Sequence, residues 1–185
     1  FLPAKKTGTY EGHRNGLTST QLTEEINTAD ANSHVGARWS SPAFGGIGTY
    51  LSTPQNVMAA AEAYFLRAEG ALLGWNMGGT AKDLYEAGIR TSMNQWGITD
   101  NAAITAYINS TSTPIAPNDY LNSPPMTNIP VLFNAGNVAI ANEQIATQKW
   151  LAMFPDGHEA WADYRRSRYL KLYPVANSEN PDITN

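Results

Sequence analysis

The feature that most constrains this sequence is a pair of apolar stripes at helical spacing, separated by a short glycine-rich break. Apolar side chains that recur every three or four residues are typical of one buried face of an α-helix. The first stripe consists of Val57, Met58, Ala61, Phe65, Ala68, Leu72 and Trp75. The second consists of Leu84, Tyr85, Gly88, Ile89, Ser92, Met93 and Trp96. Two such helices joined by a short loop predict an antiparallel hairpin.

Residues that favour helix ends frame this hairpin. Thr53 followed by Pro54 predicts a first helix that runs to about Trp75. Thr80 can cap the second helix, and Gly97 stands where a C-terminal glycine belongs. Ala81, Tyr85 and Gly88 also match the second helix of a tetratricopeptide repeat, which places small residues around an aromatic one.

Other helix signals extend along the chain. They predict a short helix from Thr20 to Thr28, a third major helix from Asp100 to about Asn109, a fourth from about Asn137 to Met153, and a fifth beginning at Asp156. We therefore expect an all-α fold, with tetratricopeptide-like helical hairpins and long ordered loops.

Composition divides the chain into three segments. We expect a loop-rich segment at 1–52, a helical scaffold at 53–172 with a proline-rich excursion at about 110–136, and a polar tail at 173–185. The first residue is Phe, and no charged leader with an apolar run precedes the domain. The sequence therefore has the character of a piece of one larger domain.

The overall composition excludes several classes of function. Charged residues make up only 15% and the net charge is −4, which argues against nucleic acid or anionic lipid as a partner. The absence of cysteine removes disulfides, thiolate metal sites and cysteine nucleophiles. No run approaches the ~20 apolar residues that a membrane span needs.

Few side chains are suited to catalysis. The three histidines are far apart, and none has a metal-ligand partner at helical spacing. Glu62 and Glu69 share one helix face about two turns apart, which could suit a pair of catalytic carboxylates. A buried ion pair between Glu69 and Arg67 or Arg90 explains that position equally well. An enzyme is therefore not indicated, and no metal or cofactor is expected.

Aromatic residues in the first loops indicate a different kind of site. Sugar rings stack on aromatic rings, while nearby polar groups bind their hydroxyl groups. The residues that could form such a site are Tyr10, Arg38, Trp39, Phe44 and Tyr50. The alternative is that Trp39, Phe44 and Tyr50 pack the loops onto the helices.

Three blocks of sequence resemble a known family. AEAYFLRAEGALLGWNMGG at 61–79, LYEAGIRTSMNQWGI at 84–98 and IATQKWLAMFPDGHEAWADYRRSRYLKL at 145–172 resemble the C-terminal region of the SusD/RagB family, and its SusD-like branch in particular. Together they cover most of 54–172, and their order and spacing are specific to that family.

The resemblance implies a function. Family members are lipid-anchored, cell-surface-facing outer-membrane proteins of Bacteroidetes-type bacteria, in which loops on a tetratricopeptide-like scaffold hold the ligand. They cover a SusC-type TonB-dependent transporter and capture oligosaccharides for starch or glycan utilisation, without catalysis or a cofactor. The lipid anchor would lie upstream of this chain. Because much of the family's ligand site would lie outside it as well, we expect the isolated chain to bind glycan weakly or not at all.

The same resemblance assigns the residues of the three blocks to the scaffold. The expected structural residues are Trp75, Trp96, Trp150, Trp161, Glu69, Arg90, Glu159, Arg165 and Arg166. Arg165 or Arg166 is expected to pair with Glu143 or Glu159. Alternative functions are the binding of a peptide or another nutrient on the same architecture, and a helical protein-interaction scaffold that binds no small ligand.

Overall fold

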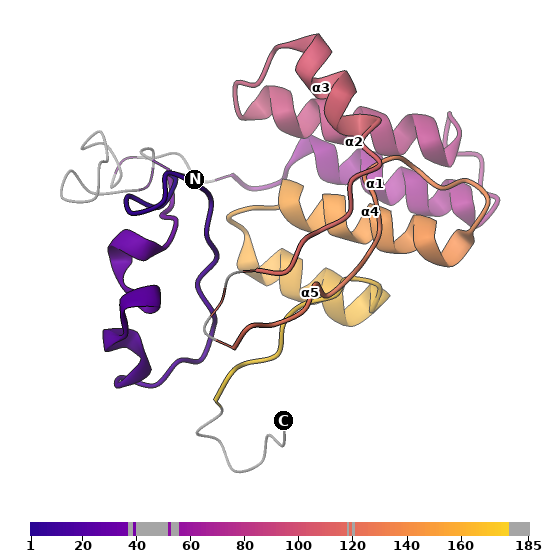
Figure 1. Ribbon diagram of the computed structural model, residues 1–185. Coiled ribbons are helices and arrows are strands. Elements are labelled where there is room, and N and C mark those ends of the chain that lie inside the picture. The colour runs from indigo at the N-terminus through magenta and orange to yellow at the C-terminus, as the bar shows by residue number, and fades with distance from the viewer. Residues whose placement is uncertain (37–38, 40–51, 53–55, 118, 120, 178–185) are drawn as a thin grey trace. The chain divides into compact units, whose positions relative to one another are not determined.

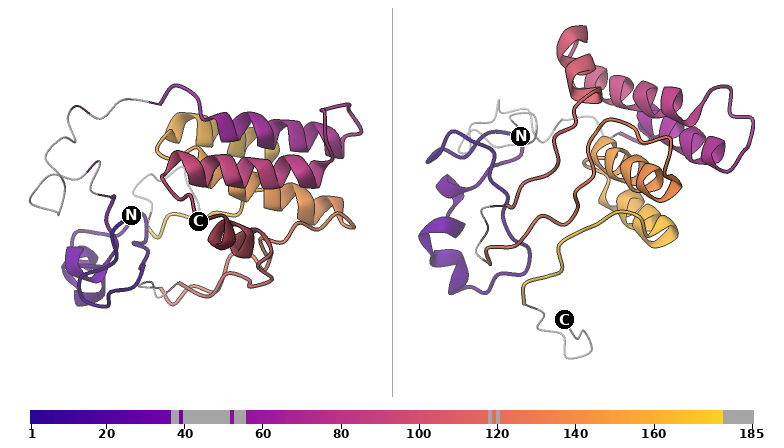
Figure 2. Two further views of the ribbon diagram at one scale, coloured as in Figure 1. Left: turned by 90° about the horizontal axis from the view of Figure 1, so that it is seen from above. Right: turned by 45° about the vertical axis from the view of Figure 1, so that its right-hand side comes forward.

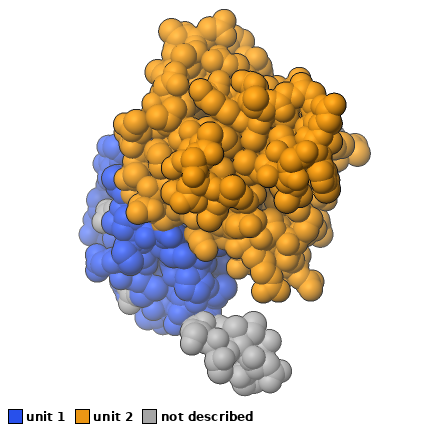
Figure 3. Space-filling view, turned by 90° about the vertical axis from the view of Figure 1, so that its right-hand side faces the viewer, with its two compact units in different colours: residues 1–55, 115–126, 172–185 blue, residues 56–114, 127–171 orange. Residues whose placement is uncertain are grey.

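The computed structural model describes residues 1–36, 39, 52, 56–117, 119 and 121–177. The chain forms two compact units, which Figure 3 shows in different colours. Unit 1 comprises residues 1–55, 115–126 and 172–185, and unit 2 comprises residues 56–114 and 127–171.

The regular secondary structure in the described part of unit 2 is entirely helical. The helices are α1 (Ala60–Leu72), α2 (Ala81–Gln95), α3 (Asn101–Ile108), α4 (Val138–Ala152) and α5 (Gly157–Ser167). Helices α1 and α2 form an antiparallel hairpin, α4 packs against both, α3 packs against α2, and α5 packs against α4 (Figures 1 and 2). The predicted all-α fold with tetratricopeptide-like hairpins is confirmed. None of the described helices combines the length and apolarity that crossing a lipid bilayer demands.

Side-chain caps begin four of these helices, as the sequence predicts. Thr80 Oγ1 accepts a hydrogen bond from the backbone N–H of Asp83 at 3.1 Å. Asp100, Asn137 and Asp156 each accept two backbone N–H groups at the starts of α3, α4 and α5. These bonds satisfy donors that have no partner within the helix, and each such cap stabilises the fold by about 1 kcal/mol.

The core of unit 2 centres on three aromatic rings. Tyr85 packs edge-on against Phe65 and lies 5.0 Å from the ring of Phe133. The Tyr85 hydroxyl donates to the carbonyl oxygen of Val131 at 2.8 Å, so its polar atom is satisfied inside the core. A Cβ atom at Gly88 would lie 2.7 Å from the Phe65 ring, and the hairpin therefore packs this closely only with glycine.

The first predicted helix is shorter than its stripe. Helix α1 begins at Ala60, whereas Val57 and Met58 precede it and are 92% and 63% exposed. Its end comes before Trp75, because Gly74 adopts a left-handed conformation and the Trp75 backbone N–H returns to the Gly70 carbonyl. The predicted helical spacing therefore holds only between Ala60 and Leu72, and Pro54 lies outside the described residues.

In unit 1, three 3₁₀ turns are found where the sequence predicted one short helix. These are η1 (Gln21–Thr23), η2 (Glu25–Asn27) and η3 (Ala29–Ala31). The Asn27 side chain donates to the Gln21 carbonyl, and Asn32 donates to the carbonyls of Ile26 and Thr28. Side-chain amides thus satisfy carbonyls that a continuous helix would have bonded to its own backbone.

Polar contacts also dominate the interior of unit 1. Arg14 and Asp119 are both buried and lie 3.7 Å apart. The Arg14 guanidinium stacks over the Tyr173 ring at 4.7 Å, and the Tyr173 hydroxyl donates to the Pro124 carbonyl. Unit 1 is therefore held together by polar and cation–π contacts among its own segments.

Candidate functional site

The structure describes two of the five predicted ligand-binding residues. Arg38, Phe44 and Tyr50 lie outside the described residues. Tyr10 is 71% exposed, as a ligand-stacking ring must be, while Trp39 is partly buried. Whether these residues form one site stays a prediction.

A hollow of about 410 Å³ lies in unit 1, beside the segment that carries Tyr10. Its volume falls in the range of ordinary small-molecule sites, roughly 300–1,000 Å³. It is lined by Lys6, Thr7, Glu11, Glu24, Glu25, Ile26 and Ala31. Hydroxyl and carboxylate oxygens on this lining can accept hydrogen bonds from neutral, hydroxyl-rich ligands.

Residues that line this hollow are held by hydrogen bonds and by an ion pair. The Glu11 carboxylate accepts a hydrogen bond from Thr9 Oγ1 at 2.6 Å, and the Glu11 backbone N–H donates to Ser33 Oγ at 2.9 Å. Lys6 pairs with Glu25, which lowers the pKa of that carboxyl through a hydrogen bond and the charge of Lys6. The Glu25 carboxylate on this lining is therefore ionised at neutral pH.

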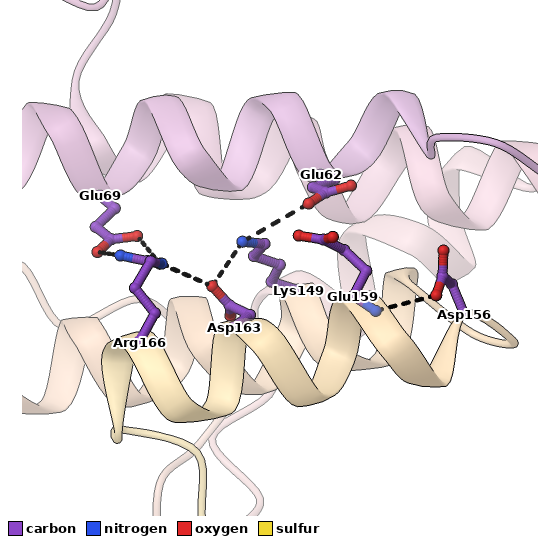
Figure 4. Close-up of polar contacts among 7 residues, drawn as sticks. All are labelled: Glu62, Glu69, Lys149, Asp156, Glu159, Asp163 and Arg166. Atoms are coloured by element: carbon purple, nitrogen blue, oxygen red, sulfur yellow. Dashed lines mark hydrogen bonds and ion pairs between the residues drawn. The ribbon is translucent and has the colours of Figure 1, made fainter.

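Unit 2 contains a chain of ion pairs that joins α1, α4 and α5, and its central members are buried (Figure 4). Its centre is Lys149 on α4, whose side chain is only 3% exposed. The Lys149 ammonium donates to Asp163 Oδ1 at 2.8 Å and lies 3.8 Å from Glu62 Oε1. The buried ammonium is therefore compensated from both neighbouring helices.

The chain continues along α5 to a second carboxylate of α1. Arg166 donates to Asp163 Oδ1 at 2.8 Å and to both oxygens of Glu69 at 2.7 Å. This two-pronged geometry is the strongest form of arginine–carboxylate pairing. Burial alone would raise the pKa of Asp163, but hydrogen bonds from Lys149 and Arg166 outweigh it and hold the pKa below its usual value.

The predicted partners of these charged residues were wrong. Arg166 pairs with Glu69 and Asp163, whereas Glu143 accepts a hydrogen bond from Thr127. Arg165 stacks over the Trp161 ring. Helical spacing identifies the face on which each charge lies, but the partner is set by which helices pack together.

The expected pairing of Glu69 within the hairpin was also wrong. Arg67 donates to the Met77 carbonyl and so closes the loop that follows α1. Arg90 donates to Thr105 Oγ1 at 3.1 Å and so joins α2 to α3. Both arginines are therefore used in local contacts, and Glu69 faces α5 instead.

A small acidic cleft lies beside Glu62. Its internal volume of about 20 Å³ suits one water molecule. Burial raises the pKa of Glu62; Lys149 lowers it, and the nearby charges of Glu159, Asp163 and Asp156 raise it further. Glu159, an expected structural residue, is exposed on α5 and faces Glu62 (Figure 4).

This arrangement is suited to holding helices together rather than to catalysis. Lys149 is engaged by two carboxylates, and the cleft is too small for a sugar ring. Among the described residues, no group of three metal-ligating side chains is placed to hold an ion. The sequence reasoning missed Lys149 and Asp163, although Asp163 precedes Arg166 by three residues, a spacing that favours an ion pair.

Three of the four tryptophans expected to be structural residues are exposed. Trp75 is 62% exposed, Trp161 59% and Trp150 38%. Trp96 is partly buried and packs against Phe154 at 6.3 Å. The core of unit 2 is formed instead around Phe65, Tyr85 and Phe133, and the structural role of the four tryptophans stays a prediction.

Comparison with known proteins places this helical architecture in one class, the outer-membrane lipoproteins. The family model described as SusD-like, "Susd and RagB outer membrane lipoprotein", matches residues 4–185. The chain belongs to this SusD-like family.

Three solved relatives show the extent of the likeness. A chitin-binding SusD homologue from Flavobacterium johnsoniae is 48% identical, with a TM-score of 0.58, over 66% of this chain and 26% of that one. A SusD homologue from Bacteroides thetaiotaomicron is 41% identical, with a TM-score of 0.62, over 69% of this chain and 27% of that one. A homologue from Bacteroides vulgatus is 32% identical, with a TM-score of 0.65, over 94% of this chain and 33% of that one.

The chain spans only about a quarter to a third of the length of these solved relatives. No curated protein matches it.

Proposed function

We propose that this chain is part of a cell-surface glycan-binding subunit of a TonB-dependent nutrient import complex, and that it has no catalytic role. The observation that carries the proposal is the 48% identity to a relative that is described as chitin-binding. Family membership supports a lipid-anchored outer-membrane location and a SusC-type transporter as partner.

The proposed glycan site lies in unit 1. The hollow lined by Thr7 and Glu11 offers hydrogen-bond acceptors, and the exposed Tyr10 ring offers a stacking surface. Arg38, Trp39, Phe44 and Tyr50 are proposed to complete the site. The lining of the hollow carries three glutamates and one lysine, which favours a neutral or cationic glycan over an acidic one.

The test is a titration of the chain with chitooligosaccharides, a wider glycan panel and a peptide library, followed by NMR so that weak binding is detected. We expect a chitooligosaccharide to bind and Tyr10→Ala or Trp39→Ala to weaken that binding, whereas Trp75→Ala, an exposed aromatic control in unit 2, leaves it unchanged. Binding of peptides but no glycan would replace the proposal with the peptide alternative. Release of products from a labelled glycan would contradict the non-catalytic role.

One observation favours a second candidate, a protein-interaction scaffold. Leu73 and Trp75, which follow α1 in the hairpin turn, are 63% and 62% exposed. Exposed apolar residues at such a turn suit contact with a protein partner. A chain that binds no member of the glycan panel or the peptide library would favour this candidate.

A further inference from the structure

A turn in unit 1 carries the only asparagine–glycine pair of the sequence, Asn15 followed by Gly16. Asparagine is a thermolabile residue, and a following glycine, which has no Cβ atom, lets its own backbone nitrogen approach the asparagine side chain unhindered. Asn15 is exposed to solvent. Within the described part of the chain, neither the Asn15 carboxamide nor the Gly16 N–H has a hydrogen-bond partner. No competing bond therefore holds the two groups apart.

A backbone contact at this turn favours a reaction between the two groups. When the Gly16 amide loses its proton, the negative charge is shared with the carbonyl oxygen of Asn15, because nitrogen and oxygen of a peptide group are in resonance. The backbone N–H of Ala176 donates to that oxygen at 2.9 Å. A donor that already points at the atom where charge develops stabilises the charge without reorganisation. The contact therefore eases removal of the Gly16 amide proton.

The packing of unit 1 requires glycine at position 16. Gly16 adopts a left-handed conformation, with φ of 80°. A Cβ atom there would lie 2.2 Å from Cγ1 of Val175, so a larger residue cannot enter without moving the backbone. The fold thus retains the glycine that makes Asn15 labile, whereas no hydrogen bond of the described residues depends on the Asn15 side chain.

The same turn holds the segment 173–177. The Gly16 carbonyl oxygen accepts hydrogen bonds from the backbone N–H and from the side-chain amide of Asn177, at 3.0 and 2.9 Å. The residue before Asn15, Arg14, is buried and stacks over the Tyr173 ring at 4.7 Å. A change in the length of the backbone at this turn would therefore displace the groups that hold the segment.

We propose that Asn15 is a self-modification site, at which the chain converts its own asparagine to aspartate and isoaspartate, and that isoaspartate releases the segment 173–177. The Gly16 nitrogen gives up its proton and attacks Cγ of Asn15. A carbon–nitrogen bond forms, and the side-chain nitrogen of Asn15 leaves with a proton as ammonia. Water then opens the resulting succinimide ring at either of its carbonyl groups.

The two products differ in their backbone. Opening at one carbonyl gives aspartate, whose backbone is unchanged. Opening at the other gives isoaspartate, in which the backbone runs through the former side chain and is longer by one methylene group. Only isoaspartate therefore misplaces the carbonyl oxygens that bind Ala176 and Asn177. The inference rests on the contacts of unit 1 alone and stands apart from the proposed import function.

The test incubates the whole folded chain at mildly alkaline pH, where the amide proton is lost more readily, and follows its peptides by mass spectrometry. We expect Asn15 to gain the mass difference between an amide and an acid, with isoaspartate among the products. Asp156 is an internal control, because it is also followed by glycine. Its Oδ1 accepts two backbone N–H groups at the start of α5, so it should remain aspartate.

Hydrogen exchange measures the release. In the isoaspartate form, the amide protons of Ala176 and Asn177 should lose their protection from exchange. Asn15→Gln, whose longer side chain closes the ring far less readily, should stay unmodified and keep that protection. Freshly prepared Asn15→Asp carries the charge of the product on an unchanged backbone and should keep it as well.

Two results would overturn the inference. An Asn15 that stays an amide in the folded chain would reject the modification site, and conversion of a urea-unfolded sample alone would show that the turn protects it. Isoaspartate that leaves Ala176 and Asn177 protected, or a loss of protection in fresh Asn15→Asp, would reject release by the longer backbone.

Discussion

The two contact surfaces of α1 are built from opposite chemistry. Toward α2, the helix packs Phe65 against Gly88 and Tyr85, so this contact is apolar and closely fitted. On its other side, it presents Glu62 to Lys149 of α4 and Glu69 to Arg166 of α5. Asp163 is the one residue of α5 that is fully buried. One helix is therefore joined to one neighbour mainly by hydrophobic burial and to another mainly by charge.

The two kinds of contact contribute differently to the stability of unit 2 and to the positions of its helices. Hydrophobic burial stabilises the fold but is compatible with many arrangements of the helices. A buried ion pair contributes little net stability, but any arrangement that leaves one of its charges unpaired is strongly destabilised. We infer that the α1–α2 contact stabilises unit 2, and that the ion pairs fix the position of α5.

Removing the aromatic centre of the apolar contact should have the largest effect. Phe65→Ala leaves a cavity against Gly88 and Tyr85 and is expected to lower the free energy of unfolding by about 3–5 kcal/mol. Urea unfolding followed by circular dichroism measures this loss. It should hardly change with salt concentration, and a strong salt dependence would contradict the apolar description.

Breaking the polar contact should lower the free energy of unfolding slightly less, and the loss should depend on which buried charges remain. Asp163→Ala leaves the buried Lys149 without its closest partner, and we expect a loss of about 3 kcal/mol. The triple variant Glu62→Leu, Lys149→Met, Asp163→Leu removes the buried charges together and should recover most of that stability. If the triple variant is less stable than the single one, the ion pairs contribute net stability and the comparison fails.

A smaller change probes the close approach of the hairpin helices. Gly88→Ala places a methyl group 2.7 Å from the Phe65 ring, and the resulting overpacking should cost about 1–2 kcal/mol. The control is Gly157→Ala, because a Cβ there meets no atom within 4 Å. Equal stability of both variants would show that the α1–α2 contact adapts more freely than its packing indicates.

The smallest expected effect is a pH dependence at Glu62. Burial raises its folded-state pKa above the ordinary value of 4.5, so the folded protein binds a proton more readily than the unfolded chain. The Glu62 contribution therefore becomes more favourable as pH falls through that raised pKa, and it is least favourable at neutral pH.

Glu62→Gln should consequently stabilise the protein at pH 7, by on the order of 0.5 kcal/mol. The gain over the parent chain should shrink as pH falls toward 4.5, the ordinary pKa of a glutamate. Asp163 behaves in the opposite sense, because its lowered pKa gives stability that is lost in stronger acid. Measuring the difference between parent and variant at each pH isolates Glu62, and a gain that does not change with pH would contradict this account.

Local signals in the sequence predicted most of the helices correctly. Thr80, Asp100, Asn137 and Asp156 each cap the helix that they were expected to begin, because a cap bonds to backbone groups only two or three residues away. The start of α1 was misplaced because Ala59 precedes it without a side-chain cap bond. The predicted loop site could be followed only at Tyr10 and Trp39, since its other members lie outside the described residues.

By itself, the sequence determined the helical hairpins, the caps and the family, since these depend on short-range spacing and on a specific order of blocks. The tertiary structure decided which residues are buried and which charges meet. Glu69 and Arg166 are 97 residues apart, and no local rule could pair them. It likewise exposed Trp161 and buried Lys149, because the space between packed helices, rather than hydrophobicity alone, decides which side chains enter the core.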